Sequence, residues 1–284
     1  MPFALNFAVA GSLDQFVALI NDLVAHEKRP SLLILPSEKD VQALRRALAP
    51  LGIEMWVPDD IHQEVERLRA LRLDLLVCSG FPQILKTPIL ELPRLGCVNL
   101  HTSRLPDYRG RHPVNWALIL GEREIGITLH FMNERIDDGD IILQDTVPVG
   151  RDDDINDVQR RLIPIGCRMV NAGLDQIAAG TVYRRHQLRQ LSRYLPKRRP
   201  DDGRVNFEQS GREINRLVNA LVDPLPNAFA IDGDERVHLK RAHLGHEVGE
   251  VLAETRDGRY VIAVQDGVIL VSTDRRLSVG SILT

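Results

Sequence analysis

Short, almost wholly apolar segments alternate with segments of helical periodicity through the first half of the chain, and this pattern most restricts its possible folds. Residues 6–11, 31–36 and 73–78 are apolar runs of strand length. Between them, residues 12–23 and 40–48 show the apolar spacing of helices. Strands that are apolar on both faces and are separated by helices indicate a parallel sheet covered on both sides. We therefore expect a doubly wound α/β domain.

The same alternation continues with a predicted helix at 64–71 and predicted strands at 97–101 and 125–132, so we place the first domain at residues 1–182. The first strand-to-helix turn contains the single glycine Gly11, whereas a dinucleotide fingerprint has three in GxGxxG. This disfavours NAD or FAD binding. A GxxxxGK[ST] motif is also missing, which excludes a P-loop nucleotidase.

The character of the sequence changes after residue 182. Residues 183–209 are rich in Arg, Pro and Asp and are predicted to form a linker loop. An amphipathic helix is expected at 213–222, followed by short alternating strands at 236–240, 260–264 and 268–271. The Asp-Gly dipeptides at 257–258 and 266–267 favour tight turns. We expect residues 210–284 to form a small antiparallel β-rich, OB-like domain.

Composition excludes several classes of protein. The longest apolar runs are about seven residues, far below the roughly 20 that a membrane span requires. The three cysteines form no CxxC pair, and the N-terminal residues have no cationic region of the kind found in secretion signals. The net charge of −3 argues weakly against nucleic acid as the main partner. We therefore expect a cytoplasmic protein with no membrane partner.

Polar residues capable of acid–base chemistry follow two of the predicted strands. Asn99 and His101 are two residues apart near the carboxyl end of one strand, so their side chains leave the same face. Asp137 follows the next strand. An amide, an imidazole and a carboxylate that converge in this way suit acyl transfer to an amine. The sequence has no GxSxG motif, and its cysteines lie within apolar runs, which favours direct transfer over a covalent acyl-enzyme.

The loop after these residues resembles the signature of the 10-formyltetrahydrofolate-dependent formyltransferases. The matching string is Asn99-x-His101-x-Ser103-x-Leu105-Pro106-x-x-Arg109-Gly110-x-x-Pro113, followed by Gly126-x-Thr128-x-His130-x-Met132 and Asp137-x-Gly139. The resemblance implies a Rossmann-like formyltransferase fold and 10-formyltetrahydrofolate as co-substrate. It also implies that Asn99 stabilises the oxyanion, that His101 accepts the amine proton and that Asp137 holds His101. Arg104 departs from the family pattern, in which leucine is usual.

The resemblance assigns further binding residues. The pterin would be bound by Asp137 and by the segment that follows the strand at 73–78, namely Phe81, Pro82, Gln83 and Ile84. Ser103, Arg111 and Asn115 are predicted to bind the acceptor, although Arg111 and Asn115 suit a solvated surface equally well. Asp138 and Asp140 compete with Asp137 for the catalytic role. The basic run 197–199 is more often a solvated stretch than a phosphate site, and the histidines show no metal spacing, so no metal is expected.

The acceptor is predicted from differences within the family. The transferases that act on methionyl-tRNA carry an insertion after the second strand and a basic C-terminal domain, and this chain shows neither. Residues 109–116, 194–203 and 223–229 resemble the enzyme that formylates UDP-4-amino-4-deoxyarabinose. We therefore favour a nucleotide-linked amino sugar as acceptor, with a homodimer as a possible assembly. Methionyl-tRNA, a small amine such as hydroxyornithine, and a non-catalytic folate-binding module are the alternatives.

Overall fold

A computed structural model describes residues 5–37, 41–188, 194–232, 234–244, 253–254, 259–264 and 267–274 of the 284-residue chain. The chain divides into two compact units. The first consists of Met1–Gly110, Gly126–Thr146 and Arg161–Tyr194, and the second of Arg111–Ile125, Val147–Arg160 and Leu195–Thr284. The segments of the two units therefore interleave along the sequence.

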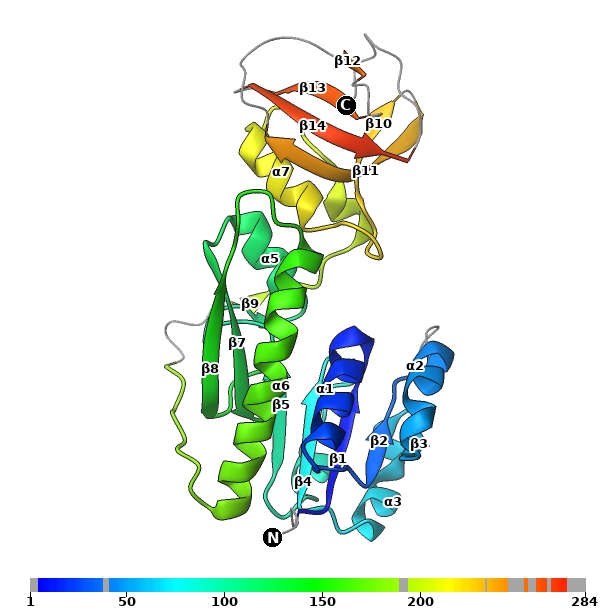
Figure 1. The fold of residues 1–284 in the computed structure, drawn as a ribbon, viewed down its shortest axis with the longest axis vertical. Coiled ribbons are helices and arrows are strands. Elements are labelled where there is room, and N and C mark those ends of the chain that lie inside the picture. Colours follow the sequence, from blue (N-terminus) through cyan, green and yellow to red (C-terminus); the bar gives the residue numbers. More distant parts are fainter. Residues whose placement is uncertain are drawn as a thin grey trace. The chain divides into compact units, whose positions relative to one another are not determined.

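A seven-stranded sheet with the strand order β3-β2-β1-β4-β5-β7-β8 is built from the described residues (Figure 1). The strands are β1 (Phe7–Gly11), β2 (Leu32–Ile34), β3 (Glu54–Trp56), β4 (Leu75–Ser79), β5 (Cys97–His101), β7 (Glu124–Phe131) and β8 (Ile141–Pro148). The first five strands pair in parallel. The strand order reverses between β1 and β4, as in the predicted doubly wound fold, which is thereby confirmed.

Helices cover both faces of this sheet. They are α1 (Leu13–Ala25), α2 (Val41–Leu48), α3 (Val65–Ala70), α4 (Thr87–Leu90) and α6 (Ile155–Ala179), with the short 3-10 helices η1 (Ala49–Leu51) and η2 (Ile61–Glu64). On one face, Leu68 of α3 and Ile89 of α4 pack in a buried cluster with Ala8, Leu76 and Cys78 of the strands. Helices α1 and α6 lie side by side over the other face (Figure 1).

A buried polar contact joins α6 to the end of α1. Lys28, almost fully buried, donates from Nζ to the Asn171 carbonyl oxygen at 2.9 Å and to Asp175 Oδ2 at 2.8 Å. The Asn171 amide in turn donates to Asp22 Oδ2 at 2.6 Å. Burying an ammonium group requires such partners, because an unpaired charge inside a protein is strongly unfavourable. These bonds fix α6 against α1.

Helix α6 approaches the sheet closely at two glycines. A Cβ on Gly166 would lie 2.8 Å from Leu100 and 2.9 Å from Ile127, and a Cβ on Gly173 would lie 2.3 Å from Leu129. The side chains of Leu100, Ile127 and Leu129 therefore point toward α6. Because side chains alternate along a strand, the intervening residues of β5 and β7 point to the opposite face.

Strand β7, which the sequence predicts at 125–132, runs antiparallel to β5, so the sheet is mixed rather than wholly parallel. The register places Asn99 opposite His130 and His101 opposite Thr128. Facing residues on antiparallel strands have Cβ atoms about 4.5–5.5 Å apart. The antiparallel register thus gathers four polar side chains on the face opposite α6.

The second unit contains a five-stranded antiparallel sheet within its described residues, in the order β10-β11-β14-β13-β12. Its elements are α5 (Pro113–Leu120), η4 (Pro200–Gly203), α7 (Gly211–Asn219), β10 (Ala228–Asp232), β11 (Glu235–Leu244), β12 (Ala253–Glu254), β13 (Tyr260–Val264) and β14 (Gly267–Thr273). The predicted small antiparallel domain is confirmed. The predicted turns at 257–258 and at Asp266 lie outside the described residues, as do residues 189–193 of the predicted linker.

Two further short strands, β6 (Arg109–Gly110) and β9 (Tyr194–Leu195), complete the described elements. Residues 200–203 of the predicted linker form η4, and Arg204 makes a parallel bridge to Phe229. In the described part of the chain, no helix combines the length and apolar character needed to cross a membrane.

Candidate active site

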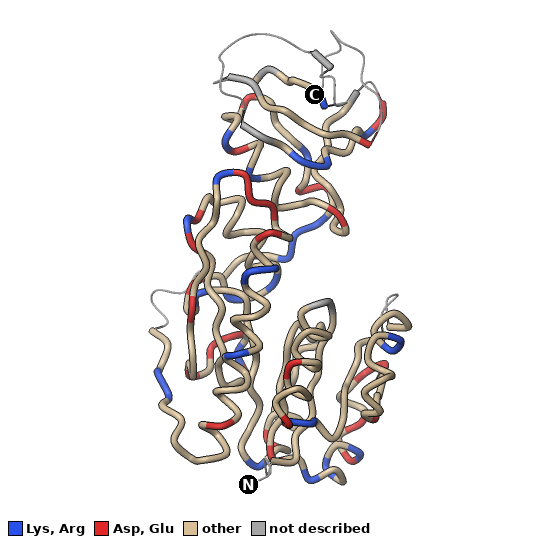
Figure 2. The backbone as a smooth tube through the Cα atoms, in the orientation of Figure 1, with Lys and Arg blue, Asp and Glu red and all other residues tan. Residues whose placement is uncertain are grey.

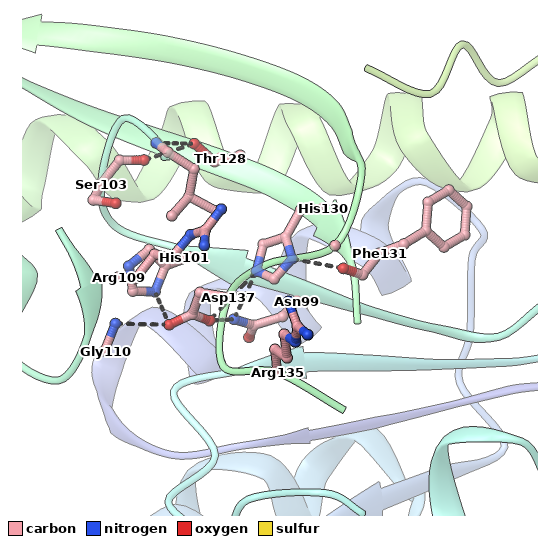
Figure 3. Close-up of polar contacts among 12 residues, drawn as sticks. Asn99, His101, Ser103, Arg109, Gly110, Thr128, His130, Phe131, Arg135 and Asp137 are labelled. Carbon is pink, nitrogen blue, oxygen red and sulfur yellow. Dashed lines mark hydrogen bonds and ion pairs between the residues drawn. The ribbon is translucent and has the colours of Figure 1, made fainter. Parts of the chain in front are cut away.

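Polar side chains from β5, β7 and the loop after β7 converge at one place on the sheet (Figure 3). Asn99 Nδ2 lies 3.3 Å from Asp137 Oδ1 and 3.3 Å from His130 Nε2. His101 Nδ1 lies 3.6 Å from Asp137 Oδ2. The structure therefore brings together Asn99, His101 and Asp137, the three residues that the sequence predicts as catalytic, and adds His130 to them.

Asp137 is the centre of this group. Its Oδ2 accepts a hydrogen bond from the Gly110 backbone N–H at 2.9 Å and faces His101, whereas its Oδ1 faces Asn99 and lies 3.5 Å from His130 Nε2. Burial alone raises the pKa of the Asp137 carboxyl, but the positive charges of His101 and His130 in their protonated forms, together with the Gly110 N–H, hold this pKa well below its usual range. The carboxyl is therefore ionised at neutral pH despite its burial.

The other two acidic residues of this loop have different partners. Asp138 Oδ1 lies 2.6 Å from Arg109 Nη1, in an ion pair buried on both sides. Asp140 Oδ1 lies 2.5 Å from His186 Nδ1. Of the three carboxylates that the sequence left in competition, Asp137 is the one that faces His101.

The hydrogen-bond partners of the two histidines define which ring nitrogen carries the proton. His101 Nε2 lies 2.9 Å from the Tyr108 carbonyl oxygen, and His130 Nδ1 lies 2.7 Å from the Phe131 carbonyl oxygen. A carbonyl oxygen can only accept, so each of these nitrogens is the donor. In the neutral rings, His101 Nδ1 and His130 Nε2 then carry the lone pairs, and both of these atoms face Asp137.

The loop between β5 and β6 is held by a side chain from β7. Thr128, fully buried, donates from Oγ1 to the Ser103 carbonyl oxygen at 2.6 Å and accepts from the Leu105 N–H at 3.3 Å. Ser103, predicted to bind the acceptor, donates from Oγ to the Asp107 carbonyl oxygen at 2.8 Å. In this structure the Ser103 hydroxyl thus shapes the loop that carries Tyr108 to His101.

Two motif glycines permit close backbone contacts beside the site. A Cβ on Gly126 would lie 2.5 Å from the Arg104 backbone nitrogen, and a Cβ on Gly139 would lie 1.9 Å from the Phe131 carbonyl oxygen. That same Phe131 oxygen accepts the hydrogen bond from His130. Only glycine lets the loop after β7 pass over this oxygen, which explains why the motif has glycine at 139.

The segment predicted to bind the pterin follows β4 in the first unit. Phe81 packs against the buried cluster beneath α3 and α4, whereas Ile84 is 58% exposed. Gln83 accepts from the Ile61 N–H at 2.9 Å and donates from Nε2 to the Asp59 carbonyl oxygen at 3.2 Å. This segment, which also contains the half-buried Pro82, is therefore tied by Gln83 to the turn before η2.

Arg111 and Asn115, predicted to bind the acceptor, both lie in the second unit. Asn115 is buried, and its Nδ2 donates to the Ala220 carbonyl oxygen at 2.7 Å, which joins α5 to α7. Arg111 is exposed. Arg111 directly follows Gly110, whose N–H binds the Asp137 carboxylate.

Sequence reasoning missed His130 and Gln187 as members of the site. His130 stands in the motif, and a signal was available: it alternates with Thr128 on a strand that leads to Asp137. Gln187 is buried and donates from Nε2 to the carbonyl oxygens of Asp137 and Gly139, at 3.0 and 2.7 Å. Its position in the sequence gives no such signal. Among the described residues, no group of three His, Cys, Asp or Glu side chains could hold a metal ion.

Comparisons with known proteins identify the family of this chain. A formyl transferase family model matches residues 7–169, and a model of the formyl transferase C-terminal domain matches residues 197–278. The chain belongs to the formyltransferase family. This membership confirms the predicted enzyme class, a folate-dependent formyltransferase, and its co-substrate 10-formyltetrahydrofolate.

The names of the similar proteins point to different acceptors. The methionyl-tRNA formyltransferase of Geobacter metallireducens is 34% identical over 212 residues, covering 73% of this chain and 68% of the relative. That of Moorella thermoacetica is 32% identical over 277 residues, covering 97% and 86%. The solved structure of an N-formyltransferase from Helicobacter canadensis, with folinic acid and dTDP-3-aminofucose, superposes with a TM-score of 0.74 at 19% identity, covering 95% of this chain and 99% of that one. This last likeness shows the fold.

Proposed function

We propose that this formyltransferase acts on the amine of a sugar linked to a nucleoside diphosphate. The observation that carries the proposal is a basic cluster in the second unit, made of Arg111, His112, Lys197 and Arg198. Burial and the nearby charges of Arg111, Lys197 and Arg198 lower the pKa of His112, which places these cations around one imidazole. Guanidinium and ammonium groups bind phosphate oxygens well, so the cluster suits a diphosphate.

Contacts with α5 hold the 196–198 part of this cluster in place. Trp116 donates from Nε1 to the Pro196 carbonyl oxygen at 3.0 Å, and the Arg198 guanidinium lies 4.9 Å from the centre of the Trp116 ring. Arg198 also donates to the Asp202 carbonyl oxygen at 2.6 Å. The basic run that the sequence left as a solvated stretch is thus packed against the helix that begins just after Arg111 and His112.

Methionyl-tRNA is the second candidate acceptor, because relatives that are 34% and 32% identical bear that name. An RNA-binding surface requires many cations, since its affinity comes largely from phosphate contacts. Residues 195–284 contain 13 Lys and Arg against 14 Asp and Glu. Figure 2 shows basic and acidic residues interspersed along the chain. This balance favours a small diphosphate over a long polyanion.

For the co-substrate, we propose that the pterin lies against the segment of Phe81, Pro82, Gln83 and Ile84. The exposed Ile84 side chain supplies apolar surface, and the Gln83 bonds to the turn before η2 fix the backbone groups of this segment. A pterin ring needs apolar surface and hydrogen-bonding groups held in place, and this segment offers Ile84 for the first and its backbone groups for the second.

The geometry supports a proton path through His101 and Asp137. The neutral His101 ring has its lone pair at Nδ1, so this atom accepts the proton that the amine loses as its nitrogen bonds to the formyl carbon. The resulting imidazolium is stabilised by Asp137 Oδ2 at 3.6 Å. The same proton then returns from Nδ1 to the folate nitrogen as its bond to the formyl carbon breaks. The products are a formamide and tetrahydrofolate, and no net proton is consumed.

Asn99 is proposed to stabilise the oxyanion that forms on the formyl oxygen. In this structure its Nδ2 faces Asp137 and His130 at 3.3 Å, which is long for a hydrogen bond. Such contacts are easily exchanged for a charge-assisted bond to an oxyanion, which is stronger than a neutral one. Asp137 and His130 would then orient the Asn99 amide and leave an N–H of this amide available to the oxyanion.

A panel of acceptors tests the proposed function. The purified protein and 10-formyltetrahydrofolate would be mixed separately with a dTDP-linked 3-amino sugar, UDP-4-amino-4-deoxyarabinose, methionyl-tRNA and hydroxyornithine. We expect one nucleotide sugar to gain a single formyl group. The folate absorbance would follow the reaction, and mass spectrometry would give the mass of the product. Formylation of methionyl-tRNA alone, or of hydroxyornithine alone, would contradict the proposed acceptor, and folate binding without turnover of any of them would favour the binding-module alternative.

The basic cluster is tested on the acceptor that the panel identifies. Arg111→Ala and Lys197→Ala should each raise the acceptor KM by about 10-fold, because each removes one charge-assisted bond to phosphate. The kcat value and the KM for 10-formyltetrahydrofolate should stay unchanged. Arg212→Ala, which removes an exposed arginine of α7, is the matched control and should leave all three constants unchanged. An unchanged acceptor KM in both cluster variants would show that the cluster does not bind the acceptor.

A further inference from the structure

The backbone at Asp137 is held in an unfavourable conformation. Its φ angle is +50°, in the left-handed region that side chains other than glycine seldom adopt. Such a conformation persists only where surrounding contacts enforce it. The contacts of the Asp137 carboxylate are with Asn99, His101, His130 and the Gly110 N–H, all of which depend on its direction. The groups that hold the backbone of this residue therefore bear on the geometry of the whole site.

Gln187, which follows α6, binds this backbone directly. Its Nε2 donates to the carbonyl oxygen of Asp137 at 3.0 Å and to that of Gly139 at 2.7 Å, so both amide hydrogens are used. Its Oε1 accepts from Arg109 Nη2 at 2.7 Å and from Arg109 Nε at 3.2 Å. Arginine can only donate and carbonyl oxygens can only accept, so these partners define one orientation of the amide.

Arg109 extends the same network to the other side of the carboxylate. It forms a buried ion pair with Asp138, the residue after Asp137, and it precedes Gly110, whose N–H binds Asp137 Oδ2. Gln187 thus joins the backbone that carries the catalytic carboxylate to the segment that supplies its N–H partner. The Gln187 amide therefore holds both the backbone of Asp137 and Arg109, the residue before the Gly110 N–H that binds the carboxylate.

We infer that Gln187 is a positioning residue for formyl transfer: it holds the left-handed backbone at Asp137, and thereby directs the carboxylate toward His101 Nδ1. This inference rests on the catalytic role proposed for Asp137. Gln187 acts through Asp137 and Arg109. A displacement of about 1 Å in a catalytic group can cost about 10²-fold in rate, so the effect of losing this amide should be visible in turnover.

Gln187→Met tests the inference, since methionine keeps the length of the side chain without the amide. With 10-formyltetrahydrofolate and the acceptor that the panel identifies, we expect kcat to fall by about 10²-fold. The acceptor KM should stay within about 2-fold, because the groups proposed to bind the acceptor are untouched. The acidic limb of the pH–rate profile should move to higher pH, because a loosened Asp137 loses part of the contact with His101, His130 and Gly110 that lowers its pKa.

Asn171→Leu is the matched control, because Asn171 is also a buried amide of the first unit that donates two hydrogen bonds, to Asp22 and to the Cys167 carbonyl oxygen. It should lower Tm while leaving kcat and the pH profile unchanged. Gln187→Glu keeps the acceptor for Arg109 but places an anion against two carbonyl oxygens, so its kcat should fall at least as far as that of Gln187→Met. If Gln187→Met does not fold, Gln187→Glu tests the inference in its place.

A folded Gln187→Met or Gln187→Glu protein with wild-type kcat and pH profile would overturn the positioning role, whatever its Tm. Asp137→Asn assayed beside it separates this failure from failure of the proposed catalytic role. An inactive Asp137→Asn with an active Gln187 variant contradicts the inference alone. A fully active Asp137→Asn contradicts both the role of Asp137 and the inference that depends on it.

Discussion

Asp137→Asn is expected to lower kcat by about 10³-fold while the protein stays folded. The amide is nearly the same size as the carboxylate but carries no charge, so the imidazolium formed at His101 would lose its counter-ion. An amide nitrogen at the position of Oδ2 would also face the Gly110 N–H, with two donors opposed. Steady-state kinetics with the acceptor found by the panel measures the loss.

A control for this variant must also remove a well-bonded carboxylate. Asp74 accepts from the Asn6 N–H at 2.9 Å and from Arg94 at 3.0 Å, and these two bonds lower its pKa below the usual range against the smaller opposing effect of burial. Asp74→Asn should therefore leave kcat unchanged. Near-normal turnover in Asp137→Asn, with or without an effect of Asp74→Asn, would contradict the catalytic role of Asp137.

The lowered pKa of Asp137 also predicts a pH dependence of stability. A carboxyl whose pKa is lower in the folded than in the unfolded chain stabilises the fold above its unfolded value of about 4, and this contribution is lost as the pH falls further. The Tm of the wild type should exceed that of Asp137→Asn at pH 7, and the difference should shrink as the pH falls from 5 toward 3. A difference that grows in acid would show that the carboxyl is not stabilised in its ionised form.

The sequence predicts the parts of the sheet that are apolar on both faces. Strands β1, β2 and β4 are buried along their length, so each appears as a nearly uninterrupted apolar run. Strand β3 has an exposed glutamate at its start and gives no such run. The 25-residue helix α6 was not predicted, because its contact with the sheet is made by glycines and Pro164 lies within it. Residues that allow close packing are the ones that weaken the helical pattern.

The site was predictable where its residues lie close in sequence. Asn99 and His101 share a face through the two-residue period of a strand, and the motif spacing adds Asp137. His130 stands in the motif and alternates with Thr128 on β7, but its place opposite Asn99 depends on the antiparallel register of β5 and β7, which the sequence of one strand does not reveal. The contact of Asn115 with Ala220 joins residues 105 positions apart, and this structural bond could not be foreseen from the loop that contains Asn115.

His101→Ala is expected to reduce kcat by about 10³–10⁴-fold, because it removes both the proton acceptor at Nδ1 and the partner that Asp137 orients. The loss should appear in kcat more than in either KM, because the imidazole accepts the proton in the transition state and contributes little to binding of the substrates. Loss of the ring also leaves the Tyr108 carbonyl oxygen without its 2.9 Å donor. A modest fall in Tm should therefore accompany the kinetic effect.

Two further measurements separate lost chemistry from a damaged loop. Added imidazole should restore part of the rate in His101→Ala, because the buried space left by the ring can admit a free base. His26→Ala, which removes an exposed histidine at the end of α1, is the matched control and should behave as the wild type. Rescue that rises with the concentration of neutral imidazole fits a proton acceptor at this position. Turnover of His101→Ala near the wild-type rate without imidazole would instead place the proton acceptor elsewhere, with His130 Nε2 as the other lone pair that faces Asp137.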